Sequence, residues 1–139
     1  MIQPQDAPEA FQSAWNRHDM QDFGALFHPD ATFVNRFGHY VRGVDAIVAL
    51  HAEIHSTIYS DSSLVNELIA VVSLGDASAV VHFWCRLTTG VAHPAGPHAM
   101  DTLIQAVMTR HNEQWKFIAV ENVTLTDPRS GKIVLRGDA

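Results

Sequence analysis

The stretch SLVNELIAVVSLGDASAVVHFWCRLT, from Ser63 to Thr88, decides the fold class. Its two halves are rich in β-branched and aromatic residues, which favour strands. Gly75 and Asp76 between the halves are typical of a tight turn. The pattern therefore predicts an antiparallel hairpin with strands at residues 63–74 and 77–88.

The chain after this hairpin repeats the pattern. A loop rich in glycine and proline at residues 89–97 separates the two hairpins. Residues 100–111 and 114–126 are again β-branched and aromatic, and Asn112 and Glu113 between them predict a second tight turn. The polar tail contains one further candidate, a short edge strand at residues 132–136.

The half of the chain before the first hairpin is mainly helical by the spacing of its apolar residues. That spacing predicts helices at residues 6–18, 20–27 and 44–56. Asp19 is expected to cap the second helix, and the segment at residues 31–37 predicts a strand. Helices first and strands afterwards indicate an α+β fold.

The composition limits the class of protein. A chain of 139 residues has the size of one domain, so we expect residues 1–139 to form a single unit, with a core at 7–126 and a tail at 127–139. Hydrophobic residues make up 47% and charged residues 17%, as in globular proteins. The formal net charge is −6 and no basic cluster is present, which argues against a nucleic-acid partner.

Three features favour a cytoplasmic protein with no membrane partner. The longest apolar run, residues 68–72, is far shorter than the roughly 20 residues that a membrane span needs. Residues 1–10 are acidic and interrupted by prolines, unlike a signal peptide. The single cysteine, Cys85, has no partner for an internal disulfide.

The turns predict which residues face the helices. A two-residue turn at Asn112 and Glu113 would pair Met108 with Phe117 and Ile104 with Glu121. Glu121 is therefore expected to face the helices, while its neighbour Asn122 faces away. In the first hairpin, Leu68, Ala70 and Val72 are expected on the inner face with Phe83. The opposite face retains Trp84 and several β-branched residues, which favours a homodimer as its cover.

Four segments carry a family resemblance: FQSAWNRHD at residues 11–19, LFHPDATFVN at 26–35, GVDAIVALH at 43–51 and WKFIAVENVT at 115–124. They resemble the SnoaL-like branch of the nuclear-transport-factor-2-like superfamily, most closely the SgcJ/EcaC family. The resemblance implies a cone, in which a curved and mostly antiparallel sheet wraps over three N-terminal helices and encloses a pocket. It also implies a dimer. Relatives include isomerases, cyclases, dehydratases, hydrolases and non-catalytic binding domains.

The resemblance disfavours ketosteroid isomerase chemistry. The catalytic base of those enzymes corresponds to Asn35, and an amide does not abstract a proton near neutral pH. Their oxyanion-hole tyrosine corresponds to Phe11, which has no donor. Their late acidic residue falls near residues 103–106, where this chain has no acid.

His51 and Glu121 are the candidate catalytic residues. His51 lies about 40° from Ile47 on its helix, within the apolar arc. It is either a general base or donor in the pocket, or a core histidine that bonds a carbonyl. Glu121 is either a carboxylate of raised pKa in an apolar pocket or a solvated side chain at the mouth of the cone.

Seven further residues are candidates for contacting a substrate: Trp15, His18, Phe33, Asn35, Phe83, Thr102 and Phe117. His18 has the alternative of satisfying a carbonyl at the end of its own helix, which the sequence favours. A buried Asn35 is expected either to bind the ligand or to be tied to Trp15 or His51.

No metal and no cofactor is expected. His51 and His55 lie one helical turn apart, as in some zinc sites. Glu53, however, is about 200° round the helix from His51, so it does not reach a metal held by both histidines. The sequence has no dinucleotide-binding glycine fingerprint.

Two functions remain from this reasoning. The first is a cofactor-independent cyclase, isomerase or hydrolase that acts on a small apolar metabolite of polyketide or aromatic type by general acid–base catalysis. The second is a non-catalytic dimeric module that binds a small hydrophobic ligand or a partner protein.

Overall fold

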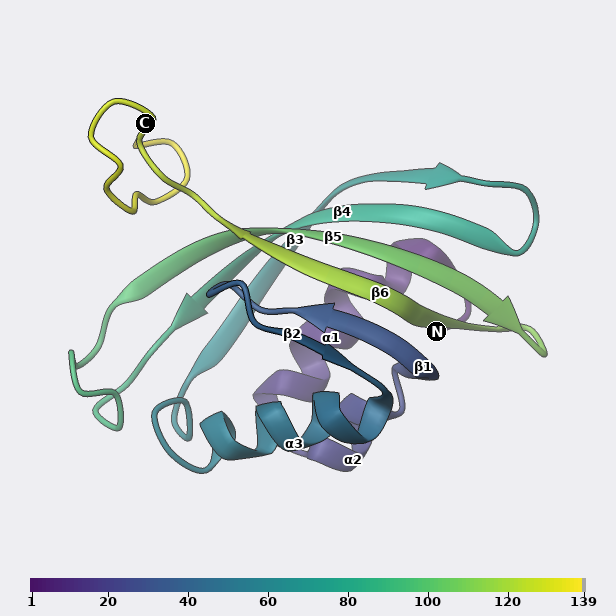
Figure 1. The fold of residues 1–139 in the computed structure, drawn as a ribbon, viewed down its shortest axis with the longest axis horizontal. Coiled ribbons are helices and arrows are strands. Elements are labelled where there is room, and N and C mark those ends of the chain that lie inside the picture. The colour runs from purple at the N-terminus through teal and green to yellow at the C-terminus, as the bar shows by residue number, and fades with distance from the viewer. Residues whose placement is uncertain (139) are drawn as a thin grey trace.

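One curved sheet of six strands covers three helices (Figure 1). The computed structural model describes residues 1–138. The strands are β1 (Phe27–Val34), β2 (Tyr40–Arg42), β3 (Ser63–Ser73), β4 (Ser78–Thr88), β5 (Ala99–His111) and β6 (Gln114–Thr124), in the spatial order β2-β1-β6-β5-β4-β3. The helices are α1 (Ala7–Asn16), α2 (Met20–Gly24) and α3 (Val44–His55), after a short 3-10 turn at Pro4–Asp6. Neighbouring strands are antiparallel except β1 and β6. The expected α+β class is confirmed.

The turn between α1 and α2 is fixed by local hydrogen bonds. Asp19 caps α2 as predicted, because its Oδ1 accepts from the backbone N–H groups of Gln21 at 2.9 Å and Asp22 at 3.1 Å. His18 before it has a left-handed backbone, with φ of 53°. Helix α2 ends at Gly24, earlier than predicted, and strand β1 begins at Phe27 instead of residue 31. Phe27 leaves the helix because it pairs with Phe117 of β6, a contact that helical spacing does not reveal.

Two β-bulges change which side chains face the helices. In β6, Phe117 pairs with Met108 but Ala119 pairs with Val107, so Ile118 is an extra residue. In β3, Leu68 pairs with Phe83 as predicted. The next pair is Ala70 with His82, so Ala70 and Val72 lie on the outer face and that part of the prediction is wrong. Each bulge moves the residues beyond it to the opposite face of the sheet.

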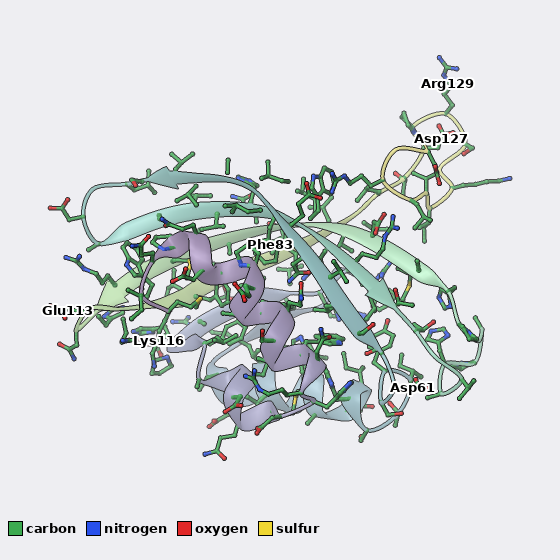
Figure 2. The ribbon with its side chains drawn as sticks, turned by 180° about the vertical axis from the view of Figure 1, so that it is seen from behind. Asp61, Phe83, Glu113, Lys116, Asp127 and Arg129 are labelled. Atoms are coloured by element: carbon green, nitrogen blue, oxygen red, sulfur yellow. The ribbon has the colours of Figure 1, made fainter. Side chains whose placement is uncertain are left out.

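An aromatic core fills the space between α1, α2 and the middle of the sheet. Phe23, Phe83 and Phe117 are fully buried there. Figure 2 labels Phe83 where α1 passes under the sheet. Phe11 of α1 packs against all three phenylalanines, with ring centroids 5.2 to 6.1 Å apart. Burying each such ring contributes about 2 kcal/mol to folding.

The tail after β6 folds onto the outer face of the sheet. Within residues 125–138 the tail has an isolated bridge between Thr126 and Ile133 and no strand, so the predicted edge strand is wrong. Arg136 holds the tail instead: its guanidinium pairs with Glu67 at 2.8 Å and lies 4.9 Å from the ring centroid of Trp84. None of the helices within residues 1–138 has the length and hydrophobicity required to cross a membrane.

Candidate functional site

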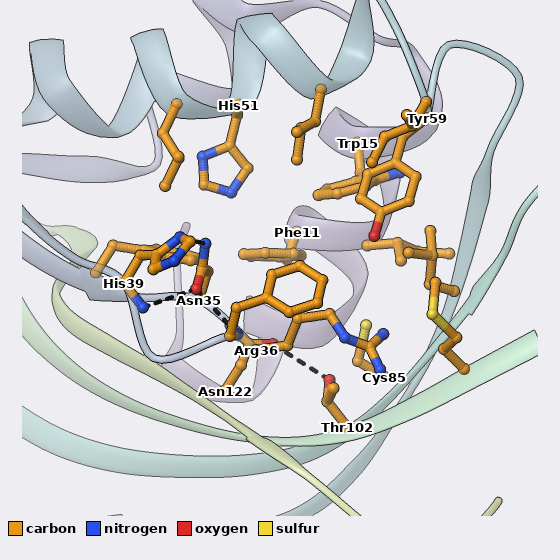
Figure 3. Close-up of a pocket in the computed structure, with 18 of the residues that line it drawn as sticks. Phe11, Trp15, Asn35, Arg36, His39, His51, Tyr59, Cys85, Thr102 and Asn122 are labelled. Atoms are coloured by element: carbon orange, nitrogen blue, oxygen red, sulfur yellow. Dashed lines mark hydrogen bonds between the residues drawn. The ribbon is translucent and has the colours of Figure 1, made fainter. Parts of the chain in front are cut away.

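A cavity of about 260 Å³ lies under α3, at the end of the cone away from the aromatic core (Figure 3). Most of its wall is apolar and comes from Phe11, Trp15, Phe33, Phe37, Leu50, Ile54, Ile58, Leu64, Leu87 and Met100. Its polar wall residues are Asn35, Arg36, His39, His51, Glu53, Tyr59, Cys85, Thr102 and Asn122. Apolar walls with a few polar groups are typical of sites for small molecules.

His51 projects from α3 into this cavity (Figure 3). Its Nδ1 lies 2.7 Å from the carbonyl oxygen of Ile47. Because a carbonyl only accepts, Nδ1 carries the hydrogen and the neutral ring has a bare Nε2. Burial lowers the pKa of His51 from 6.5 to about 4, against the smaller opposing effect of the Ile47 bond. The ring is therefore neutral at pH 7. His51 bonds a carbonyl, as the second interpretation expected, and it also lines the cavity, which the first interpretation requires.

Two aromatic side chains predicted to contact a substrate lie beside His51. Phe33 meets the imidazole edge-on, with ring centroids 4.7 Å apart, and Trp15 does so at 6.0 Å. Trp15 is held by a hydrogen bond from Nε1 to the Ser62 hydroxyl at 3.0 Å. The structure thus brings Trp15, Phe33 and His51 to one wall.

Asn35 lines the cavity but is committed to a turn. Its Oδ1 accepts from the backbone N–H groups of Phe37 at 3.0 Å and His39 at 2.9 Å. The predicted tie to Trp15 or His51 is wrong, because these local partners close the turn between β1 and β2. Its Nδ2 lies 3.3 Å from Nδ1 of His39.

Glu121 does not face the helices, contrary to the prediction. The bulge at Ile118 pairs Glu121 with Gln105 and leaves it exposed on the outer face. Asn122 pairs with Ile104 in its place and lines the cavity, although the sequence argument turned it away. The site therefore has an amide where a carboxylate was expected.

Asn122 is anchored next to Thr102, a predicted substrate contact that lines the cavity. Its Oδ1 accepts from the Thr102 hydroxyl at 3.2 Å, and its Nδ2 donates to the carbonyl of Val34 at 3.4 Å. This network crosses from β5 through β6 to β1 and fixes the floor of the cavity.

Three predicted substrate contacts lie outside the cavity wall. Phe83 and Phe117 are fully buried in the core, where each ring centroid is 6.1 Å from that of Phe11. They support the cavity from below through Phe11, which lines it and packs against both rings.

His18 is the third of these residues, and it caps no carbonyl of its own helix. Its Nε2 bonds the carbonyl oxygen of Ser62 at 3.0 Å, and its Nδ1 lies 2.8 Å from Nδ1 of His55. The left-handed backbone turns its side chain across to the end of α3.

Tyr59 and Arg36 line the cavity and were missed in the sequence argument. Tyr59 follows Ile47, His51 and His55 at intervals of four, a signal that marks one face of α3 and its extension. Burial raises the pKa of Tyr59, so its hydroxyl remains a donor. Nothing in the sequence indicated that Arg36 lines the cavity. Alternation along the strand predicts the direction of side chains up to its end, and Arg36 lies in the turn after it.

Cys85 is buried and lines the same cavity. Burial raises the pKa of its thiol to about 12, so it is not a thiolate at neutral pH. Among residues 1–138, no three His, Cys, Asp or Glu side chains are grouped so as to hold a metal ion.

Comparison with known proteins agrees with this architecture. A family model described as a SnoaL-like domain matches residues 9–134. Comparison with curated protein sequences gave no match. The chain is similar to a solved structure of an uncharacterised protein with a cystatin-like fold from Caulobacter vibrioides, with a TM-score of 0.74 and 24% identity over 91% of this chain and 89% of that one.

Two further solved structures have names that suggest an activity. One is a ketosteroid isomerase-like protein from Erwinia carotovora atroseptica, with a TM-score of 0.71 and 16% identity over 88% of this chain and 94% of that one. The other, from Novosphingobium aromaticivorans, is described provisionally as a scytalone dehydratase. Its TM-score is 0.73, with 18% identity over 93% of this chain and 87% of that one. At these identities the likeness shows the fold, which confirms the expected cone.

Proposed function

The chain belongs to the SnoaL-like domain family, and on this premise we propose that it binds a small, largely apolar molecule beside His51 and transfers a proton without a cofactor. The observation that carries this proposal is the state of His51. It is neutral, its tautomer is fixed by Ile47, and its bare Nε2 belongs to the wall of an apolar cavity.

The chemistry available to His51 is that of a weak, desolvated base. With a pKa of about 4, it is unprotonated at neutral pH and so ready to accept a proton. Its low basicity restricts it to acidic protons, such as those on carbon next to a carbonyl. The proton would move from that carbon to Nε2, and the electron pair would form an enolate.

A donor for the enolate oxygen is present in the same cavity. The Asn122 amide lines it and has a second Nδ2–H besides the one that it donates to the carbonyl of Val34. Donors aimed at a developing negative charge are a major source of catalysis. Cyclisation, isomerisation and dehydration all use such an enolate, which agrees with the names of the isomerase-like and dehydratase-like neighbours.

The absence of a buried carboxylate separates this site from ketosteroid isomerase chemistry. Among the residues that line the cavity, Glu53 is the only carboxylate, and it is exposed at the rim. Asn35 and Asn122 occupy the inner polar positions. His51 is therefore the base that this proposal requires.

The narrower SgcJ/EcaC assignment is part of the proposal. Its support is the combination of Trp15-Asn16-Arg17-His18-Asp19 with the segment at residues 30–35. Within the structure these segments supply Trp15, Phe33 and Asn35 to one cavity.

The test follows proton exchange on a neutral ketone of suitable size, β-tetralone. NMR in deuterated buffer measures exchange next to the carbonyl, and quenching of the tryptophan fluorescence, to which Trp15 on the cavity wall contributes, measures binding. The wild-type protein should accelerate exchange. His51→Asn should remove the acceleration and change the dissociation constant less than threefold, by about 0.6 kcal/mol or less. His111→Asn, at an exposed site outside the cavity, is the matched control.

The second candidate, a binding module without turnover, makes a different prediction. Wild type would then bind β-tetralone without accelerating exchange, and His51→Asn would change affinity alone. The observation that favours this candidate is the low basicity of His51.

A further inference from the structure

We propose, building on the proposed function, that the ligand of this cavity carries a carboxylate and that Arg36 binds it together with the Tyr59 hydroxyl. The ligand class is then a small aromatic carboxylic acid. The proposal rests on Arg36, which lines an apolar cavity and has no carboxylate partner within residues 1–138.

Arg36 is half-buried in the turn after β1, and its guanidinium extends into the cavity toward Cys85 (Figure 3). The three ion pairs within residues 1–138 are Arg17 with Asp22, Arg86 with Asp101, and Arg136 with Glu67. Arg36 belongs to none of these pairs. Its guanidinium makes no hydrogen bond to any group within residues 1–138. The guanidinium carbon lies over the ring of Phe37, 5.6 Å from its centroid.

An arginine in this position is incomplete without an acceptor. A guanidinium has five N–H donors in a fixed plane, and partial burial removes part of their hydration. The apolar side chains around it supply no acceptor. A carboxylate on the ligand would accept two of these N–H groups in parallel.

Tyr59 supplies another donor to the same part of the cavity. The positive charge of Arg36 lowers the pKa of both Tyr59 and Cys85, although burial has the larger, opposite effect on each. Arg36 is therefore close enough to act on both groups. A guanidinium and a phenolic hydroxyl that line the same cavity form a donor set suited to an anion.

The other polar wall groups do not neutralise Arg36. Glu53 is exposed at the rim and forms no ion pair with it. His51 is neutral because burial lowers its pKa to about 4. Asn35 uses its oxygen within the turn, and Asn122 uses its oxygen for Thr102. One positive charge thus faces the ligand, which matches a monoanion.

The cavity volume limits the size of this acid. An apolar cavity of about 150 Å³ holds a benzene molecule, so about 260 Å³ suits roughly ten to twelve non-hydrogen atoms. A single aromatic ring with a short chain and a carboxylate has this size. A steroid does not.

The experiment compares cinnamate with cinnamamide, which have nearly the same shape but differ in charge. Isothermal titration calorimetry at pH 7.5 should show that wild type binds the acid about tenfold or more tightly than the amide. Arg36→Gln should remove this preference. Arg42→Gln, in the exposed strand β2 of the same hairpin and outside the cavity wall, should retain it. Tyr59→Phe should weaken the binding of cinnamate more than the binding of cinnamamide.

The outcomes separate this inference from the function on which it rests. Equal binding of acid and amide by wild type would overturn the carboxylate site and leave the cavity as a site for neutral molecules. An acid preference that survives in a folded Arg36→Gln variant would also overturn it. If wild type binds neither compound nor β-tetralone, both proposals fail. Circular dichroism and thermal melting establish that each variant is folded.

Discussion

Nδ1 of His18 and Nδ1 of His55 lie 2.8 Å apart, which joins the end of α1 to the end of α3. His18 Nε2 faces the carbonyl oxygen of Ser62, so that nitrogen carries a hydrogen. In the neutral pair, His55 therefore donates from Nδ1 to the bare Nδ1 of His18. The remaining nitrogen of His55, Nε2, is buried and has no partner among residues 1–138.

This pair should contribute to stability. His18→Ala leaves the Nδ1–H of His55 and the carbonyl of Ser62 without partners, which should reduce the free energy of unfolding by about 2 kcal/mol. Urea denaturation followed by circular dichroism measures the change. His111→Ala at an exposed site should change it by less than about 0.5 kcal/mol. Equal midpoints for the two variants would show that the pair is not stabilising.

The protein should lose stability in acid. Burial lowers the pKa of His51 and of His55 from 6.5 to about 4, so between these values the unfolded chain binds protons that the folded chain does not. Stability is then fully present above about pH 6.5 and falls as the pH approaches 4. His51 alone should account for about 3 kcal/mol of this loss.

Urea midpoints measured from pH 7.5 to pH 4 test this dependence. His51→Leu should flatten the profile, because it removes one titrating group from the core. A profile for this variant as steep as that of wild type would exclude His51 as a cause.

The bulge at Ile118 predicts unequal effects at two adjacent residues. Val120 is 2% exposed and faces the helices, whereas Glu121 is exposed on the outer face. Val120→Ala should cost about 2 kcal/mol of unfolding free energy. Glu121→Ala should cost less than about 0.5 kcal/mol and leave the binding of cinnamate unchanged. The reverse order would mean that the bulge is absent in solution.

The outer face of the sheet should form a homodimer. Three valines on it, Val65, Val72 and Val123, are between 48% and 65% exposed, and the half-buried Trp84 lies among these strands. Sedimentation velocity at micromolar concentration should show a dimer for wild type. Val123→Glu should shift it toward a monomer, since a charge would be buried in the interface.

Val91→Glu is the matched control, because Val91 is 85% exposed in the loop before β5 and lies off the sheet. It should remain dimeric. A wild-type monomer at this concentration would contradict the prediction.

Local pattern accounts for much of what could be predicted. Asn112 and Glu113 both have positive φ, at 50° and 65°, as the two-residue turn requires. The pairing of Met108 with Phe117 next to that turn is confirmed. The helical spacing from Ile47 to His51 correctly placed His51 on an inward face. Each of these depends on residues close in sequence.

The prediction fails beyond each bulge. Glu121 was expected opposite Ile104 but pairs with Gln105, and every residue of β6 after the bulge lies on the face opposite to the predicted one. A bulge inserts one residue without a change in composition, so alternation alone does not reveal it. Because of this one extra residue, Asn122 lines the cavity in the place where Glu121 was predicted.

The sequence by itself determined the three helices, the hairpins β3–β4 and β5–β6, the cap at Asp19 and the inward face of α3, because hydrophobic period and turn chemistry act between near neighbours. The tertiary structure decided which polar groups meet in the cavity. Arg36, Tyr59 and Asn122 come from a turn, a helix end and a strand beyond a bulge. Their meeting depends on strand register and sheet curvature, which long-range packing sets.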